Sequence, residues 1–133
     1  MNRCVSGNKG YEIVLNIPVL YPSRNAIPVD RRQEARVKKQ WQNGVGLVVN
    51  AAMNRGKYKK FDVPVKVNIL LMFKKKRRRD IDNYAPKWLL DVLKGKCFVD
   101  DSSEWCVPSV EIFSGAEEDG MVIRITPMKE AKQ

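Results

Sequence analysis

The alternating pattern from Val63 to Phe73 constrains the fold of this chain more than any other stretch. Its odd-numbered residues are all apolar, whereas the even-numbered face carries Lys66 and Asn68 before it turns apolar. Apolar residues at every second position are typical of a β-strand with one buried face. We therefore predict a strand over 63–73, which runs directly into a block of charged residues and anchors that block.

A long amphipathic helix is predicted to begin at Asp30 and to end near Gly56. Gln33 lies three residues after Asp30, a spacing that resembles a capping box. One apolar stripe follows at helical spacing: Val37, Trp41, Val45, Val48 and Ala52. Five basic residues lie off that stripe: Arg31, Arg32, Arg36, Lys38 and Lys39. They indicate either a DNA-facing surface or an ordinary solvated helix face.

The remaining patterns complete the predicted order of elements. They predict a strand over 11–19, a helix between Pro86 and Gly95, and strands over 107–113 and 121–126. The order β-α-β-α-β-β predicts a single α/β domain over residues 1–133, with one mixed β-sheet and helices packed on it. Residues 1–10 are polar, and we expect them to be flexible.

The charge of the chain favours a polyanionic partner. Its 133 residues include 25 basic and 15 acidic side chains, which gives a formal charge of +10. This excess favours nucleic acid first and an anionic membrane second. No apolar run is long enough to span a bilayer, and no helix has the broad apolar face of a membrane-surface binder. The stretch from Met1 to Lys9 has no apolar core of a signal peptide, so we expect a cytoplasmic protein.

Missing residues exclude several catalytic classes. The chain contains no histidine, which excludes His-metal nucleases and both Ser-His-Asp and Cys-His catalysis. It has no Walker or Rossmann glycine-rich loop, so we expect no nucleotide cofactor. Its three cysteines, Cys4, Cys97 and Cys106, form neither a zinc spacing nor a disulfide framework. Any acid–base chemistry must therefore come from carboxylates, lysine, tyrosine or metal-coordinated water.

Two aspartates directly after a basic run are the strongest candidates for metal ligands. Residues 74–79 are all basic, and Asp80 and Asp82 follow them. In an extended chain these two side chains point the same way, with Cα atoms roughly 6.5–7 Å apart, and would converge on a hard cation such as Mg²⁺. A third carboxylate, from Asp100 or Asp101, could meet them at one edge of the sheet. Cation-binding carboxylates beside phosphate-binding groups indicate metal-assisted phosphodiester chemistry.

Each part of this pattern also has an ordinary structural explanation. Aspartates are common in turns, and basic runs are usually solvated faces. The combination is more specific, because a basic run, Asp-x-Asp-Asn, a lysine on the next helix and a second acidic pair occur in sequence. We therefore carry two hypotheses: a metal-dependent nuclease, and a non-catalytic basic DNA-binding module whose aspartates cap turns or pair with arginines.

Residues 77–101 resemble the RusA family of Holliday-junction resolvases from bacteria and their phages. The residues that carry the resemblance are Arg79-Asp80-Ile81-Asp82-Asn83, Lys87 four residues before Asp91, and Asp100-Asp101. A weaker match is Pro22-Ser23-Arg24-Asn25, which is similar to an early loop of the family. The resemblance implies a small homodimeric endonuclease that acts on branched DNA such as four-way junctions. It also implies Mg²⁺ as the cofactor, with Mn²⁺ as the alternative ion.

The resemblance also implies roles for individual residues. The metal ligands that it implies are Asp80, Asp82 and Asp101. The family pattern favours Asp101 over Asp100 as the third ligand, Arg79 would contact phosphate, and Lys87 would be the catalytic lysine. The family usually has this lysine four residues after the second aspartate, where this chain has Pro86. The candidate DNA-contacting residues are Lys74, Lys75, Lys76, Arg77, Arg78, Arg79 and Asn83. Dimer contacts could come from the apolar face around Leu70 and Met72 or from the helix surface of Trp88, Leu89 and Val92.

Overall fold

The structure, a computed structural model, describes residues 11–128. Four strands and two α-helices follow one another in the order that the sequence predicts. Their bounds are β1 Ile13–Ile17, α1 Arg31–Gly56, β2 Val65–Phe73, α2 Lys87–Leu93, β3 Cys106–Ser114 and β4 Gly120–Pro127. Two short 3-10 turns lie in the loops, η1 Arg24–Ala26 and η2 Ile81–Asn83. The mixed α/β class is confirmed, and the prediction for residues 1–10 falls outside the described residues.

The four strands form one mixed sheet in the order β1-β4-β2-β3. Both β1 and β2 pair with β4 in antiparallel fashion, whereas β2 and β3 run parallel. Val65 pairs with Cys106 at the start of the parallel ladder, and Phe73 pairs with Ser114 at its end. The loop that follows β2 and the loop that precedes β3 therefore leave the sheet at opposite ends, and this decides where the acidic residues lie.

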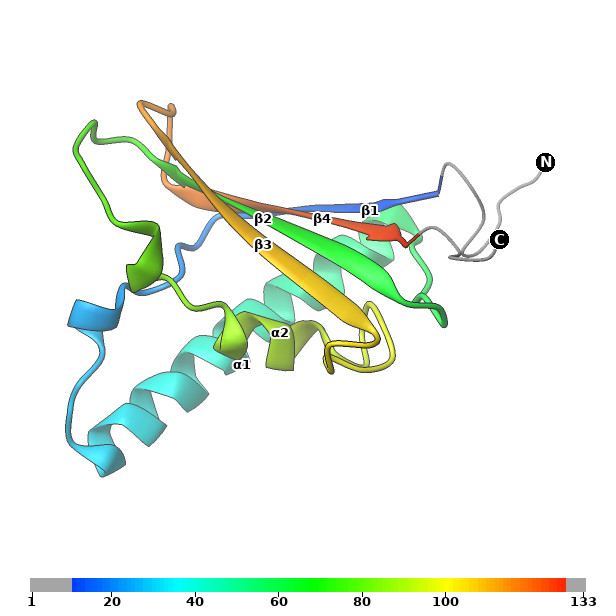
Figure 1. The fold of residues 1–133 in the computed structure, drawn as a ribbon, viewed down its shortest axis with the longest axis horizontal. Helices are drawn as coiled ribbons and strands as arrows, with labels where there is room; N and C mark the ends of the chain where they lie inside the picture. Colours follow the sequence, from blue (N-terminus) through cyan, green and yellow to red (C-terminus); the bar gives the residue numbers. More distant parts are fainter. Residues whose placement is uncertain (1–10, 129–133) are drawn as a thin grey trace.

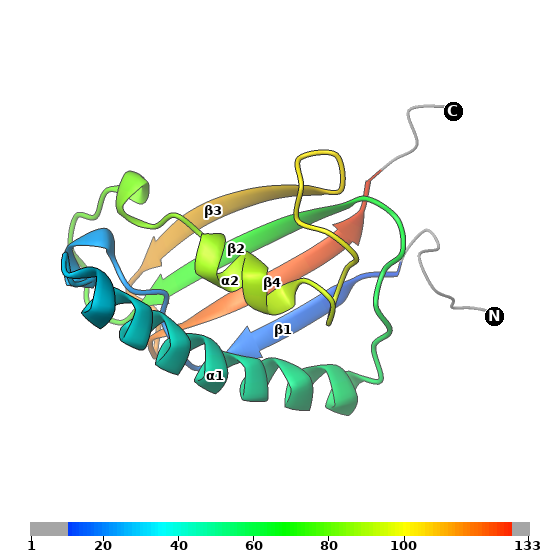
Figure 2. The same ribbon diagram turned by 90° about the horizontal axis from the view of Figure 1, so that it is seen from below.

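Both helices cover the same face of the sheet (Figures 1 and 2). Side chains that alternate onto this face are fully buried, for example Leu15, Val67, Ile69 and Ile123. Burial of each such side chain contributes about 1.5–3 kcal/mol to folding, and together they form the core between sheet and helices. The predicted apolar face of the strand over 63–73 is thus confirmed. Within residues 11–128, no helix is long and apolar enough to cross a membrane.

Within residues 11–128, no helix covers the opposite face of the sheet (Figure 1). Towards the end of β2 this face becomes apolar, because Leu70 lies beside Val122 of β4, and Met72 lies beside Phe113 of β3. Phe113 is 51% exposed, which is unusual for so large an apolar side chain. We call Leu70, Met72, Phe113 and Val122 the open-face patch.

The first helix begins as its sequence predicts. Asp30 is the N-cap, and its carboxylate accepts hydrogen bonds from the backbone N–H groups of Arg32 (2.8 Å) and Gln33 (3.4 Å). Such a cap stabilises a helix by about 1 kcal/mol. The helix ends at Gly56 and is followed by Lys57 in the left-handed conformation. Its buried face is wider than the predicted stripe and also includes Gly46, Val49 and Met53.

Candidate functional site

Arg79 folds the basic run after β2 into a compact loop. Its guanidinium Nη1 donates hydrogen bonds to the carbonyl oxygens of Lys75 (3.1 Å) and Arg77 (3.3 Å) and to Ser114 Oγ (3.2 Å). Its Cζ lies 3.8 Å from the centroid of the Phe73 ring, a cation–π contact. Arg79 Nε is buried and has no hydrogen-bond partner among the described residues. Arg79 therefore ties the loop to the ends of β2 and β3 immediately before the two aspartates.

The other basic side chains of this loop point into solvent. Residues 74–78 are all exposed, whereas Arg79 is half-buried. The loop begins with a hydrogen bond from the backbone N–H of Lys74 to Asp119 Oδ1 (2.8 Å). The exposed lysines and arginines are accessible to a phosphate backbone, and their role in binding DNA stays a prediction. The structure gives Arg79 an additional, internal use, and its predicted phosphate contact stays a prediction.

An open cavity of about 390 Å³ lies beside this loop. Its walls come from two segments that are far apart in the sequence: Ser23, Asn25, Arg77, Arg78, Arg79, Asp80, Asn83 and Tyr84. The early Pro-Ser-x-Asn loop and the basic-acidic loop therefore meet in space. Guanidinium groups favour phosphate, which they bind through paired charge-assisted hydrogen bonds. The cavity thus combines a carboxylate with groups suited to a polyanion.

Asp80 and Asp82 are arranged differently from the extended geometry that we expected. Asp80 has extended backbone angles, φ −90° and ψ 127°, but Asp82 lies within η2. The backbone N–H of Asn83 donates to the Asp80 carbonyl (3.1 Å) and closes this turn. Successive residues of a 3-10 turn are about 120° apart, so a spacing of two no longer places both carboxylates on one side. Asp80 lines the cavity, whereas Asp82 is exposed outside its lining.

The expectation that Asp101 meets Asp80 and Asp82 at one edge of the sheet is wrong. The two aspartates follow the end of β2, whereas Asp101 precedes the start of β3, where the backbone N–H of Val65 donates to the Trp105 carbonyl (2.9 Å). These ends lie on opposite sides of the molecule (Figure 2). The parallel ladder between them spans roughly 26 Å at about 3.3 Å per residue. Within residues 11–128, no three acidic side chains gather in a metal-binding group.

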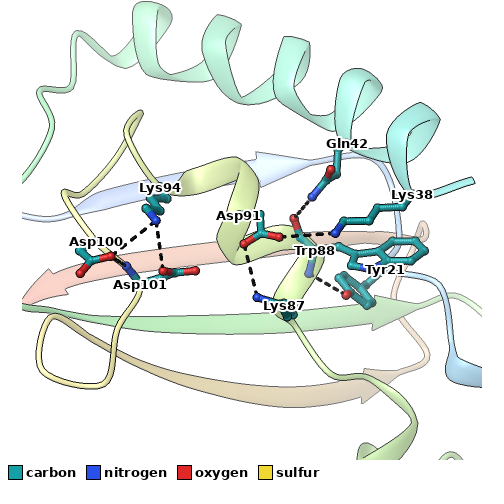
Figure 3. A network of polar contacts seen from close by, with 9 residues as sticks. All are labelled: Tyr21, Lys38, Gln42, Lys87, Trp88, Asp91, Lys94, Asp100 and Asp101. Carbon is teal, nitrogen blue, oxygen red and sulfur yellow. Dashed lines mark hydrogen bonds and ion pairs between the residues drawn. The ribbon is translucent and has the colours of Figure 1, made fainter. Parts of the chain in front are cut away.

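Lys94 holds the second acidic pair. Its Nζ lies 3.6 Å from Asp100 Oδ1 and 3.6 Å from Asp101 Oδ1 (Figure 3). A hydrogen bond from the Ser102 side chain, together with the Asp101 backbone N–H (2.9 Å) and Lys94, holds the pKa of Asp100 below its usual value. The Asp100 carboxylate therefore already has hydrogen-bond partners within its own loop. Among the described residues, the Asp101 carboxylate pairs only with Lys94, which leaves more of its oxygen lone pairs for a cation.

An aromatic cluster fixes the start of α2 (Figure 3). The hydroxyl of Tyr21 accepts a hydrogen bond from the backbone N–H of Trp88 (3.1 Å), and the Tyr21 ring meets Trp41 edge-on at 4.9 Å between centroids. Gln42 of α1 donates to the Trp88 carbonyl (3.1 Å). Burial raises the pKa of Tyr21 to about 12, so its hydroxyl stays protonated near neutral pH. The cluster connects the loop after β1 to both helices.

Lys87 lies in the first turn of α2, next to this cluster. Its side chain is 76% exposed, and its Nζ lies 3.9 Å from Asp91 Oδ1. An exposed pair at this distance contributes little stability, so the ammonium group can leave Asp91 at small cost. The structure therefore leaves Lys87 available to a substrate, and its role as the catalytic lysine stays a prediction.

A comparison with protein families decides the class of this chain. The family model described as Endodeoxyribonuclease RusA matches residues 22–126 of the 133. The chain belongs to the RusA endodeoxyribonuclease family. It is therefore an endonuclease of a family of Holliday-junction resolvases. No curated protein sequence matches it. The RusA match extends well beyond residues 77–101, and it includes the early loop at 22–25 and both acidic pairs.

The turn at residues 80–83 has the donor chemistry that a magnesium ion requires. Mg²⁺ prefers oxygen ligands, and proteins usually hold it through one or two carboxylates together with waters and substrate phosphates. Asp80 and Asp82 supply two carboxylates in this turn, and the adjacent cavity has arginine walls suited to a phosphate. The donor types at this turn therefore fit Mg²⁺, although Asp80 and Asp82 do not lie on one side of the turn in this structure. A third carboxylate would have to come from elsewhere.

The internal contacts of Arg79 predict that lysine cannot replace it. Arg79→Lys keeps the charge but loses the planar contact with Phe73 and the rigid guanidinium that places Nη1 within reach of its three acceptors. We expect the rate of junction cleavage to fall about tenfold or more, because small displacements of catalytic groups are costly, while junction affinity changes less than about twofold. Single-turnover rates and binding, measured separately, check this. Arg55→Lys, at an exposed position near the C-terminal end of α1 and away from the cavity, should leave both values unchanged, and an equal loss in the two variants would contradict the positioning role.

Proposed function

We propose that this RusA-family protein hydrolyses phosphodiester bonds in four-way junctions and other branched DNA with Mg²⁺ as its cofactor, in recombination and repair. The observation that carries the proposal is the cavity in which Asp80 lies beside Arg77, Arg78 and Arg79. A carboxylate suited to a cation, next to guanidinium groups suited to a phosphate, meets the needs of this reaction. The lack of histidine in the chain agrees with a metal-assisted route.

Each candidate residue has a role in this proposal. Asp80 and Asp82 would hold the ion, with Mn²⁺ as the alternative, and Asp101 is the proposed third ligand. When bound, the ion supplies Lewis acidity and lowers the pKa of a coordinated water. Residues 74–78 and Asn83 would bind the phosphate backbone, and Lys87 would offset negative charge that develops on the scissile phosphate. The products would carry 5′-phosphate and 3′-hydroxyl ends.

A homodimer would account for the separation of the acidic residues. A two-fold axis perpendicular to the strands reverses the direction of the parallel ladder, so the Asp101 end of one chain would approach the Asp80 end of the other. The open-face patch offers apolar surface for this contact. The helix surface that also appeared suitable from the sequence does not, because Trp88, Leu89 and Val92 are buried within the chain.

The alternative is a non-catalytic DNA-binding module in which the aspartates pair with arginines or cap turns. Among the described residues, no arginine or lysine forms an ion pair with Asp80 or Asp82, and neither side chain accepts a capping hydrogen bond. The Nη1 group of Arg79 instead donates hydrogen bonds to two carbonyl oxygens and a hydroxyl. Carboxylates left without a structural partner favour the nuclease.

A synthetic four-way junction tests the proposal. The protein should cut the junction when Mg²⁺ is present and should bind it without cutting in EDTA, whereas a linear duplex of the same sequence should remain intact. Binding without cleavage in Mg²⁺ or Mn²⁺ would favour the DNA-binding module. Equal cleavage of junction and duplex would contradict structure selectivity. Cytoplasmic location stays a prediction.

A further inference from the structure

One exposed face of α1 carries basic and amide side chains without acidic ones. Its members are Arg32, Arg36, Lys39, Asn43 and Asn50, and all are exposed. At 3.6 residues per turn they fall within roughly 60° of one line along the helix. Glu34, the acidic residue of the first turn, lies on about the opposite side. We call this set the α1 basic face.

A second open cavity, of about 430 Å³, continues this face into the groove between α1 and α2. Asn43 and Asn50 form one wall, and Lys94 and Lys96 belong to the other side. Lys38 also lines the groove, and its Nζ lies 3.9 Å from Asp91 Oδ2. This pair and those of Lys94 are long and partly exposed, so these lysines can shift to another anion at small cost.

The α1 basic face has no counter-ions among the described residues. No acidic side chain in residues 11–128 forms an ion pair with Arg32, Arg36 or Lys39. Leu47 and Val92 are the apolar side chains of the groove wall; Leu47 is 72% exposed, whereas Val92 is buried. The face therefore presents uncompensated positive charge to solvent, which attracts anions.

The face begins near the candidate active site. In both views, α1 starts at the end of the molecule where η1 and η2 lie and runs along the sheet toward the other end (Figures 1 and 2). From Arg32 to Asn50 it extends about 27 Å at about 1.5 Å per residue. This length matches roughly eight base pairs of duplex at about 3.4 Å per step.

We infer that the α1 basic face and the adjoining groove bind the phosphate backbone of a duplex DNA arm, separate from the segment that enters the Asp80 cavity. Taking DNA as the polyanion rests on the proposed function. The charges supply attraction without sequence preference, and the amides of Asn43 and Asn50 can donate hydrogen bonds to phosphate oxygens. A nuclease that holds two segments at once would favour branched over linear DNA.

Two charge-matched triple variants test this inference. One carries Arg32→Gln, Arg36→Gln and Lys39→Gln, and the other carries Arg55→Gln, Lys59→Gln and Lys60→Gln at exposed positions near the far end of α1. Both lower the formal charge by three. The slope of log affinity against log salt is negative, and it should become less steep by about 2.7 for the first variant on a four-way junction, at about 0.9 per lost phosphate contact. The second should keep the wild-type slope. Equal slopes for the two variants would overturn the inference.

A photo-crosslinking amino acid places the contact directly. Incorporated at Asn43 it should crosslink to a junction arm, whereas at Lys59 it should not.

If the wild-type protein neither binds nor cuts junctions, both the proposed function and this inference fail. If it binds and cuts normally but the first triple variant keeps its salt slope, only this inference fails. A last experiment uses vesicles that contain phosphatidylserine. If the first triple variant lost binding to these vesicles but kept its binding to DNA, the inference that the α1 basic face binds DNA would also be overturned.

Discussion

Asp80→Asn and Asp82→Asn are each expected to abolish cleavage of a four-way junction while leaving its binding intact or tighter. Both changes remove a carboxylate from the proposed Mg²⁺ site, and they also remove repulsion toward phosphate. Loss of a bound metal removes several kcal/mol of charge stabilisation, and each 1.36 kcal/mol is about a tenfold change in rate. We therefore expect the single-turnover rate to fall by at least about a hundredfold.

Asp62→Asn is a matched control for these variants, because it removes one negative charge from an exposed position away from the cavity. It should cleave at the wild-type rate. If Asp80→Asn or Asp82→Asn kept near-normal cleavage in the same assay, that residue would not be a ligand. If both did so, the site would have to lie elsewhere, and the DNA-binding module would be the better account of this loop.

Mixing two inactive variants is expected to restore one active site in each mixed dimer. Asp82→Asn and Asp101→Asn should each be inactive alone. If Asp101 acts on the site of the partner, a mixed dimer has one site with both changes and one site with neither. Co-expressed and purified through two different tags, the mixed dimer should nick one strand of a cruciform plasmid and leave open circles.

The same experiment has a clear opposite result. If Asp101 served the site of its own chain, every site of the mixed dimer would carry one change, and no nicking would appear. That result would contradict the shared site and would require the loops at 80–83 and 100–101 to move together within one chain. Asp100→Asn alone separates the two acidic neighbours: it should linearise the cruciform plasmid as the wild type does if Asp101 is the third ligand, and it should be inactive if Asp100 is.

The fold was predictable because its signals are local. Alternation in residues 63–73 and the cap at Asp30 depend on neighbours along the chain, and β2 and α1 appear close to the predicted bounds. The basic-acidic loop at the end of β2 follows from the same pattern. The early loop at 22–25 was noted only as a weaker family match, and the structure places its Ser23 and Asn25 in the same cavity lining as Asp80.

The placement of the third carboxylate was not predictable from local signals. It depends on β2 and β3 running parallel, which separates the loops that carry Asp80 and Asp101. The turn at Asp82 was missed because a spacing of two residues reads equally well as extended chain or as turn. The internal contacts of Arg79 were missed because Ser114 lies 35 residues away in sequence. Only the paired strands bring these residues together.

The most direct test of the central claim uses the wild-type protein and a supercoiled plasmid with an extruded cruciform. Two Mg²⁺-dependent sites in one dimer should cut two opposed strands within the lifetime of a single complex, so linear plasmid should appear without accumulation of nicked circles. EDTA should prevent both products. Sedimentation of the same sample should give twice the chain mass of 15.3 kDa. A monomer that leaves only nicked circles would contradict paired resolution of the junction.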